Sequence, residues 1–287
     1  MAATLPLDQP TSATTAEPST ADSLRWVVAD ALVITRRNLS HIRHVPGKLL
    51  GITVQPIMFV LLFAYVFGSA IKIPGGGNYR EFLMAGIFVQ SAAFAASATA
   101  VGLADDLTKG LLDRFRSLPM ARPAFLIGRT VADLVFATVG LVVMSACGLA
   151  VGWRMREGVL DAVAGFAIIL LFTYAFIWIF AYVGLISKTP EVAMQFGFVF
   201  SFPLTFLANT FVPTAGMPHV LRTIADWNPV SAVTEACRQL FGNPGQAEHP
   251  TAWPLQHAVA ASVVWSLLII AVFLPLSVAR YRATANR

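Results

Sequence analysis

Residues 200–218 read FSFPLTFLANTFVPTAGMP, and this stretch decides how the rest of the chain is interpreted. It opens with the dense apolar sequence of a membrane-spanning helix, and then Asn209, Pro213, Gly216 and Pro218 interrupt it. Glycine and proline mark turns and helix ends. The stretch therefore predicts a chain that crosses a membrane and then continues as short, broken segments on the far side.

The composition places the chain among membrane proteins. Of its 287 residues, 56% are hydrophobic and 12% are charged, whereas a soluble domain carries roughly 25% charged residues. The formal charge is +5, but the basic residues flank apolar runs, which favours membrane topology over nucleic-acid binding. We expect an all-α, polytopic membrane protein with no nucleic-acid partner.

Six segments are apolar for about the 20 residues that a spanning helix needs. They are approximately residues 49–71, 82–103, 126–150, 159–186, 191–212 and 255–279. Together with the segments between them they make up one predicted six-span domain, residues 23–287.

The N-terminal region contains two further predicted segments. Residues 1–22 are rich in Thr, Ser, Ala and Pro and predict a disordered cytoplasmic tail. Residues 24–45 place apolar side chains on one helical face and Arg25, Arg36 and Arg37 mostly on the other. This pattern is typical of a helix that lies in the membrane surface, although a soluble amphipathic helix shows it too.

The basic residues also predict the orientation. With the N-terminus inside, the cytoplasmic segments hold fourteen Lys and Arg residues and the outer segments hold six: Lys72, Arg80, Arg154, Arg156, Arg222 and Arg238. Because basic residues concentrate on the cytoplasmic side, we expect both termini in the cytoplasm.

This orientation places residues 213–253 outside. They contain two short helical patterns, one starting after Met217-Pro218 and the other capped by Asn228-Pro229. Each is about ten residues long, too short to span, and each has an apolar face. We therefore expect a re-entrant helical hairpin that dips into the outer leaflet between spans five and six.

The longest predicted cytoplasmic loop, residues 104–125, reads ADDLTKGLLDRFRSLPMARPAF. Leu107, Leu111, Phe115 and Leu118 recur at helical spacing among mixed charges, which suits docking onto a protein partner. A solvated connector fits the pattern equally well.

Asp105, Asp106 and Asp113 also raise the alternative that the chain is an enzyme. Such an enzyme would hold Mg²⁺ against a diphosphate, as intramembrane prenyltransferases do. The only other acidic residue on an inner loop is Glu191.

No catalytic motif is present. The chain has no G-x-x-x-x-G-K-[ST] loop for ATP, no zinc-ligand cluster and no G-x-S-x-G sequence. We therefore expect a non-enzymatic chain with no catalytic residue, no metal ligand and no cofactor of its own.

Polar and aromatic residues within the spans are candidates for function. Arg129 and Asp133, four residues apart, predict an intramembrane ion pair, while the carboxylate raises proton coupling as an alternative. Candidates for the substrate path are Gln55, Gln90, Phe202, Phe206 and Asn209. Bonds between helices would explain the polar ones equally well, and lipid contact the aromatic ones.

The chain resembles the membrane subunit of a type-2 ABC exporter, and more narrowly the drug-resistance permeases of the daunorubicin type, from about residue 24 onward. The resemblance is carried by these matches: Gly110-Leu111-Leu112-Asp113-Arg114 with Ser117-Leu118-Pro119, then Phe202-Pro203-Leu204, Phe211-Val212-Pro213, Met217-Pro218 and Asn228-Pro229. Each motif is weak alone, but their order together with the predicted topology is specific.

The resemblance implies a bacterial plasma-membrane permease in which two copies pair and each docks a separate ATPase, which holds ATP and Mg²⁺. The interfacial helix would act as an elbow. Residues 105–118 would form a coupling helix with contacts from Asp105, Asp106, Lys109, Asp113, Arg114, Phe115 and Arg116. The substrate would be a small hydrophobic drug, antibiotic or natural product leaving between the copies.

Two alternatives stay open at this point. Similar permeases export lipids or glycans, and nothing in the sequence selects the ligand. A proton-coupled secondary transporter using Asp133 is the alternative from another class.

Overall fold

The computed structural model describes residues 54, 57–67, 79–110, 122–212, 214–243 and 252–285. All regular structure in these residues is helical, as the sequence predicts. The predicted tail (1–22) and interfacial helix (24–45) lie outside the described residues. So do the ends of the first predicted span and the middle of the 104–125 loop.

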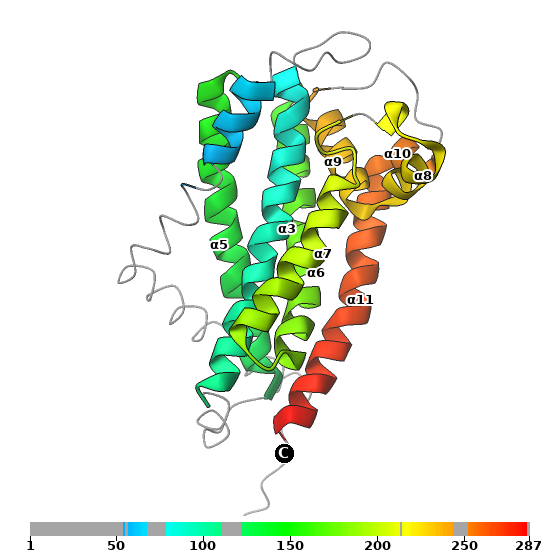
Figure 1. The fold of residues 1–287 in the computed structure, drawn as a ribbon. Helices are drawn as coiled ribbons and strands as arrows, with labels where there is room; N and C mark the ends of the chain where they lie inside the picture. Colours follow the sequence, from blue (N-terminus) through cyan, green and yellow to red (C-terminus); the bar gives the residue numbers. More distant parts are fainter. Residues whose placement is uncertain are drawn as a thin grey trace, which may run out of the picture.

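Five long helices form a bundle (Figure 1): α3 (Tyr79–Thr108), α5 (Arg122–Val151), α6 (Val159–Ile186), α7 (Pro190–Phe206) and α11 (Ala258–Ala285). Helices α3, α5, α6 and α11 are each long and apolar enough to cross a membrane. They match predicted spans two, three, four and six. Of the first predicted span, residues 54 and 57–67 are described and are helical, ending in the π-helix η2 (Phe63–Phe67).

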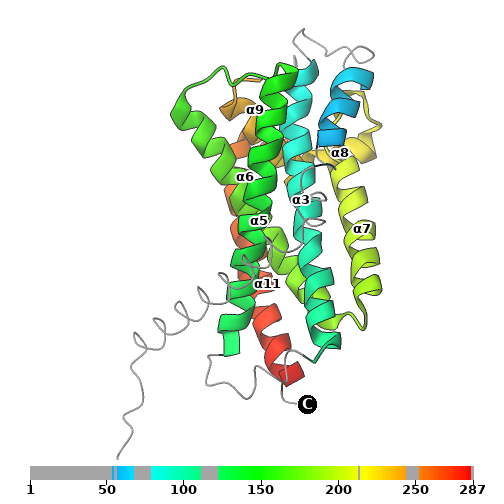
Figure 2. The same cartoon turned by 90° about the vertical axis from the view of Figure 1, so that its left-hand side faces the viewer.

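The two ends of the bundle differ (Figures 1 and 2). At the hairpin end lie the short helices η3 (Thr214–Gly216), α8 (His219–Trp227), α9 (Pro229–Leu240) and α10 (Trp253–Gln256). At the opposite end, which we call the terminal end, α3, α6 and α11 finish, and α5 and α7 begin. The predicted cytoplasmic loops and the C-terminus thus share one end of the molecule.

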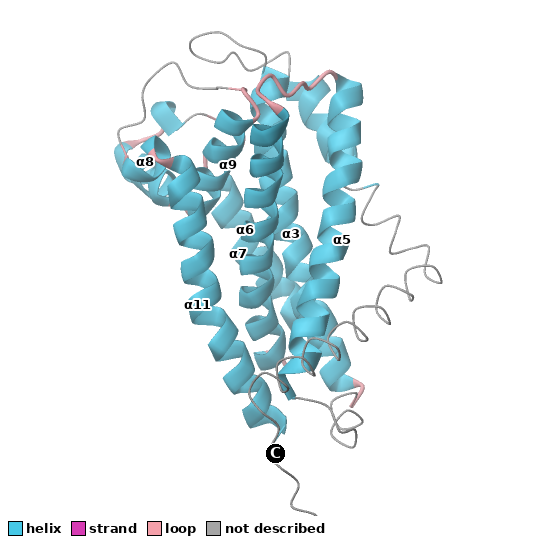
Figure 3. Cartoon of the chain, turned by 180° about the vertical axis from the view of Figure 1, so that it is seen from behind, coloured by secondary structure: helices cyan, strands magenta, loops and turns pink. Residues whose placement is uncertain are grey.

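Helix α6 forms the centre of the bundle and packs against α3, α5, α7, α9 and α11 (Figure 3). Its side chains are apolar all round, which is the pattern of a helix buried on every side. Phe172, Phe176 and Trp178 are almost fully buried. By contrast, α7 buries only a stripe of small residues, Ala193, Gly197, Ser201 and Thr205, and leaves its phenylalanines exposed.

Most boundaries follow local signals. Helix α6 spans the predicted residues 159–186. Thr189 caps α7 by accepting a hydrogen bond from the backbone N of Val192, and Pro190 follows as the first helical residue. Asn228 caps α9 in the same manner, with Pro229 next. The two short helices predicted after span five are therefore present.

Several boundaries differ from the predictions. Helix α3 runs from residue 79 to 108 instead of 82 to 103, and α5 from 122 to 151 instead of 126 to 150, because helices extend beyond their apolar cores. Helix α7 ends at Phe206 and not at residue 212, and the chain after it binds side chains of α9. The sixth span, predicted at 255–279, divides into α10 and α11 at His257, and α11 continues to residue 285.

The close approach of α3 and α6 yields one prediction. A Cβ added at Gly184 would lie 2.7 Å from the Ala100 carbonyl oxygen, so a side chain there would push two backbones apart. We expect Gly184→Val to lower the free energy of unfolding by about 1–3 kcal/mol. Thermal unfolding in detergent measures this, with Gly216→Ala as the matched control because nothing lies within 4 Å of that position. Equal unfolding temperatures for Gly184→Val and the parent would contradict the packing.

Candidate coupling site at the terminal ends of α3 and α5

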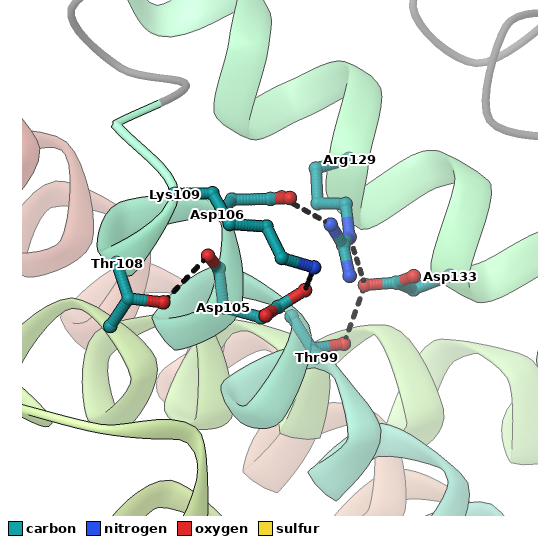
Figure 4. Close-up of polar contacts among 7 residues, drawn as sticks. All are labelled: Thr99, Asp105, Asp106, Thr108, Lys109, Arg129 and Asp133. Atoms are coloured by element: carbon teal, nitrogen blue, oxygen red, sulfur yellow. Dashed lines mark hydrogen bonds and ion pairs between the residues drawn. The ribbon is translucent and has the colours of Figure 1, made fainter.

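Arg129 is the centre of a charge cluster that joins α3 to α5 (Figure 4). Its Nη1 donates to Asp106 Oδ2 of α3 at 2.5 Å, and its Nε donates to Asp133 Oδ2 of α5 at 3.2 Å. The predicted pair of Arg129 and Asp133 is therefore present, and a second carboxylate from the neighbouring helix extends it. The Arg129 guanidinium, itself on α5, thus links α5 to α3 through the carboxylate of Asp106.

Helix α3 is shaped to receive this guanidinium. Thr99 Oγ1 donates to Asp133 Oδ2 at 2.8 Å, two helical turns before Asp106 on the same face. Between them, a Cβ at Gly102 would overlap the Arg129 guanidinium, so a larger residue there would require the Arg129 side chain to move. We call Thr99, Gly102, Asp106, Arg129 and Asp133 the Arg129 clasp.

The clasp offsets an unfavourable placement of acidic residues. Asp105 and Asp106 lie in the last turn of α3, where the helix dipole disfavours negative charge. The helix stops directly afterwards, with Gly110 in the left-handed conformation at φ +62°. Arg129 neutralises Asp106, and the side chains of Arg129, Asp106 and Asp133 are each only 18% exposed.

Asp105 is paired separately. Lys109 Nζ donates to Asp105 Oδ2 at 2.6 Å on the exposed surface, and this hydrogen bond raises the pKa of Lys109. Exposed pairs of this kind contribute little to stability. The Asp105–Lys109 pair and the Arg129 clasp therefore leave no acidic side chain of the α3 terminus without a partner.

The clasp lies at both ends of the predicted coupling loop. Helix α3 ends at Thr108, two residues after Asp106, and α5 begins at Arg122, about two turns before Arg129. Of the predicted coupling residues, Asp105, Asp106 and Lys109 are described. The others, Asp113, Arg114, Phe115 and Arg116, lie outside the described residues.

The predicted path residues are placed in two groups. Phe202 and Phe206 lie on the exposed side of α7, each 42% exposed, with their rings stacked 4.2 Å apart. Gln90 and Asn209 are buried inside the chain. Gln55 lies outside the described residues.

The chemistry of the clasp is that of a fixed ion pair. Both carboxylates accept hydrogen bonds from Arg129, and Asp133 accepts one more from Thr99, so the three side chains hold one another in fixed positions. Within the described parts of the chain, no group of three His, Cys, Asp or Glu side chains is placed to hold a metal ion.

Comparison with known proteins identifies the family. Residues 30–241 match the family model described as "ABC-2 type transporter". The chain is 32% identical, over 86% of its length and 83% of the relative's, to the daunorubicin resistance ABC transporter permease protein DrrB1 of Streptomyces coeruleorubidus.

Two mycobacterial relatives extend the comparison. The doxorubicin resistance ABC transporter permease protein DrrB of Mycobacterium tuberculosis is 26% identical over 80% of this chain and 81% of its own. The probable doxorubicin resistance permease DrrC of the same species is 24% identical over 94% of each chain.

Proposed function

Because the chain belongs to the ABC-2 type transporter family, we propose that it is the membrane-spanning permease subunit of an ATP-driven exporter in the bacterial plasma membrane. We propose that its substrate is a hydrophobic drug, antibiotic or natural product. The observation that carries this proposal is the family match over residues 30–241, together with relatives named for daunorubicin and doxorubicin resistance. The long apolar helices support a role within the membrane.

ATP hydrolysis is assigned to a separate ATPase subunit. The sequence has no G-x-x-x-x-G-K-[ST] loop, so in this proposal ATP and Mg²⁺ are held by the partner and the chain binds no cofactor. Residues 104–125, with their mixed charges and apolar edge, are the proposed docking segment.

The Arg129 clasp is the proposed anchor of that docking segment. It joins the last turn of α3 to the first turns of α5, so the loop leaves and re-enters one rigid junction. A push on the loop would then move α3 and α5 together. We assign the clasp a coupling role on this basis, because energetic coupling is carried by packed elements and charge networks.

The remaining parts of the proposal concern assembly and substrate. Two copies would pair, with both termini in the cytoplasm and the hairpin end outside. Lipid and the second copy would share the exposed apolar faces of the helices, while Phe202 and Phe206 offer stacked rings to a flat apolar substrate. The proposed export route lies between the two copies.

The ATP dependence of transport is the first test. We expect inside-out vesicles that contain the chain and its ATPase to accumulate daunorubicin when ATP is added, and to do so after a protonophore collapses the proton gradient. Accumulation driven by the gradient without ATP would identify a secondary transporter that uses Asp133. Transport of a fluorescent lipid but not of daunorubicin would favour the lipid or glycan exporter.

The prenyltransferase alternative is tested separately. Asp106 already binds Arg129, so a Mg²⁺–diphosphate complex would have to displace a guanidinium. We expect the isolated chain to form no product from a prenyl diphosphate in the presence of Mg²⁺. Mg²⁺-dependent product formation would overturn the transport assignment.

A further inference from the structure

One face of α9 carries polar side chains that bind the chain where α7 has ended. Asn228, Ser231, Glu235 and Arg238 follow each other at spacings of three, four and three residues, so they share one side of the helix. We call these four residues the α9 bracket. They contact residues 204–210.

Asn228 and Ser231 bind the first part of this segment. Asn228 Nδ2 donates to the carbonyl oxygens of Leu204 and Leu207, at 2.7 and 2.9 Å. The backbone N of Asn209 donates to Ser231 Oγ at 3.0 Å. A helix end leaves carbonyl oxygens without intrahelical partners, and here a side chain of another helix satisfies them.

Arg238 binds the last part of the segment and also reaches α3. Its Nη2 donates to the carbonyl oxygens of Asn209 and Thr210, at 2.8 and 3.2 Å, and its Nε donates to that of Phe82 at 3.1 Å. The guanidinium carbon lies 3.5 Å from the centre of the Phe82 ring. The side chain of Arg238 is completely buried.

Among the described residues, Arg238 has one carboxylate partner. Glu235 Oε2 lies 3.7 Å from Arg238 Nη1, and Asn209 Nδ2 donates to the same oxygen at 3.5 Å. Separating α9 from the 204–210 segment would leave the carbonyl oxygens of Leu204, Leu207, Asn209 and Thr210 without these partners and would remove donor contacts from the buried Arg238 guanidinium. Such groups are costly to bury alone, so the contact resists opening.

The opposite side of α9 is packed into the core. Val230, Val233 and Cys237 are fully buried, and α9 contacts α3, α6 and α11. The Cys237 thiol lies 3.8 Å from the Gly165 carbonyl oxygen of α6. Cys237 therefore reports whether α9 stays in place, because its thiol is inaccessible while α9 is packed against α6.

We propose that Arg238 is a positioning residue that joins α9, the chain after α7 and the start of α3 into one unit, and that this unit stays closed throughout the transport cycle. The proposal rests on the proposed export function. It implies that a substrate released at the hairpin end passes beside this unit and not through it. A planar guanidinium suits this position because its fixed fork of donors reaches carbonyl groups on two separate elements, whereas a lysine ammonium is a compact point charge.

The test uses the native thiol in the permease assembled with its ATPase. The chain has two cysteines, so Cys147→Ser leaves Cys237 as the only one. A maleimide that cannot cross membranes is applied to the hairpin side, at rest and after trapping with ATP and vanadate. We expect Cys237 to stay unlabelled in both states. Faster labelling in the trapped state, with Arg238 intact, would show that α9 unseats and would overturn the proposal.

Variants define the role of Arg238 itself. We expect Arg238→Lys to raise the labelling rate of Cys237 about tenfold or more by easing local opening. Arg222→Lys is the matched control, since Arg222 lies on α8 and contacts Asp226 only at 3.8 Å. Unchanged protection of Cys237 in Arg238→Lys would contradict the positioning role.

A separate cysteine distinguishes failure of this proposal from failure of the export assignment. Val220 on α8 is 69% exposed. We expect Val220→Cys in the Cys147→Ser, Cys237→Ser background to react from outside. Labelling of this residue only from the cytoplasm would refute the orientation, and loss of ATP-driven transport in the parent would refute the export function, whatever Cys237 does.

Discussion

Arg129→Met is expected to destabilise the permease and to impair coupling between ATP hydrolysis and transport. The substitution keeps an unbranched apolar stem but leaves Asp106 and Asp133 without their cation. Because both carboxylates are 18% exposed, we expect the free energy of unfolding to fall by about 2–3 kcal/mol. Thermal unfolding of the purified chain in detergent measures this loss.

The transport effect is expected to be separable from the stability effect. We expect ATP-driven efflux by Arg129→Met to fall about tenfold, as interrupting a coupling network changes coupling by up to about 2 kcal/mol. The combined variant Arg129→Met, Asp106→Asn and Asp133→Asn removes the unpaired charges, so it should regain stability but not transport. Arg222→Gln is the control, because it removes a charge on α8, far from the docking segment, whose contact with Asp226 is 3.8 Å long.

Three outcomes would contradict this role. Parental stability in Arg129→Met would show that the clasp contributes nothing to folding. Parental transport in the combined variant would show that the ion pair is structural only. Full activity in Arg129→Lys would show that a single point charge replaces a guanidinium that binds through Nε and Nη1.

Reversing both charges at Asp113 and Arg114 is expected to abolish ATP-driven transport while the chain still inserts into the membrane. The pair lies in the docking segment, where matched charges would fix the register against the ATPase. Like charges placed opposite each other cost several kcal/mol, so we expect ATPase binding to weaken about a hundredfold or more.

The measurement for this double variant is recovery of the ATPase with the tagged permease, followed by efflux. Arg154→Glu at the hairpin end is the control for a reversed charge far from the loop, and it should retain both properties. Undiminished ATPase recovery and efflux in the Asp113→Arg, Arg114→Asp chain would refute the docking assignment.

Local signals in the sequence predict much of this fold. The bounds of α6 follow from an uninterrupted apolar run, and α9 begins where Asn228-Pro229 predicts a cap. The early end of α7 depends on residues 204–210 finding partners on α9, which hydropathy does not report. The break at His257 likewise lies inside a run that reads as one apolar segment.

The candidate site could be predicted in part. Arg129 and Asp133 are four residues apart on one helix, and this spacing alone predicts their contact. Asp106 and Gly102 come from another helix, so their roles depend on the packing of α3 against α5. The structural role of Arg238 was missed because it counted only as an outer basic residue. The signal was an arginine three residues after Glu235 among apolar neighbours.

The most direct test of the central claim is affinity purification of the tagged chain from its native membrane in mild detergent, with mass spectrometry of the proteins that accompany it. We expect a stoichiometric second subunit whose sequence contains a G-x-x-x-x-G-K-[ST] loop. A chain that purifies alone through several detergents would contradict the ATP-driven assignment, and would shift the interpretation to Asp133 and proton coupling.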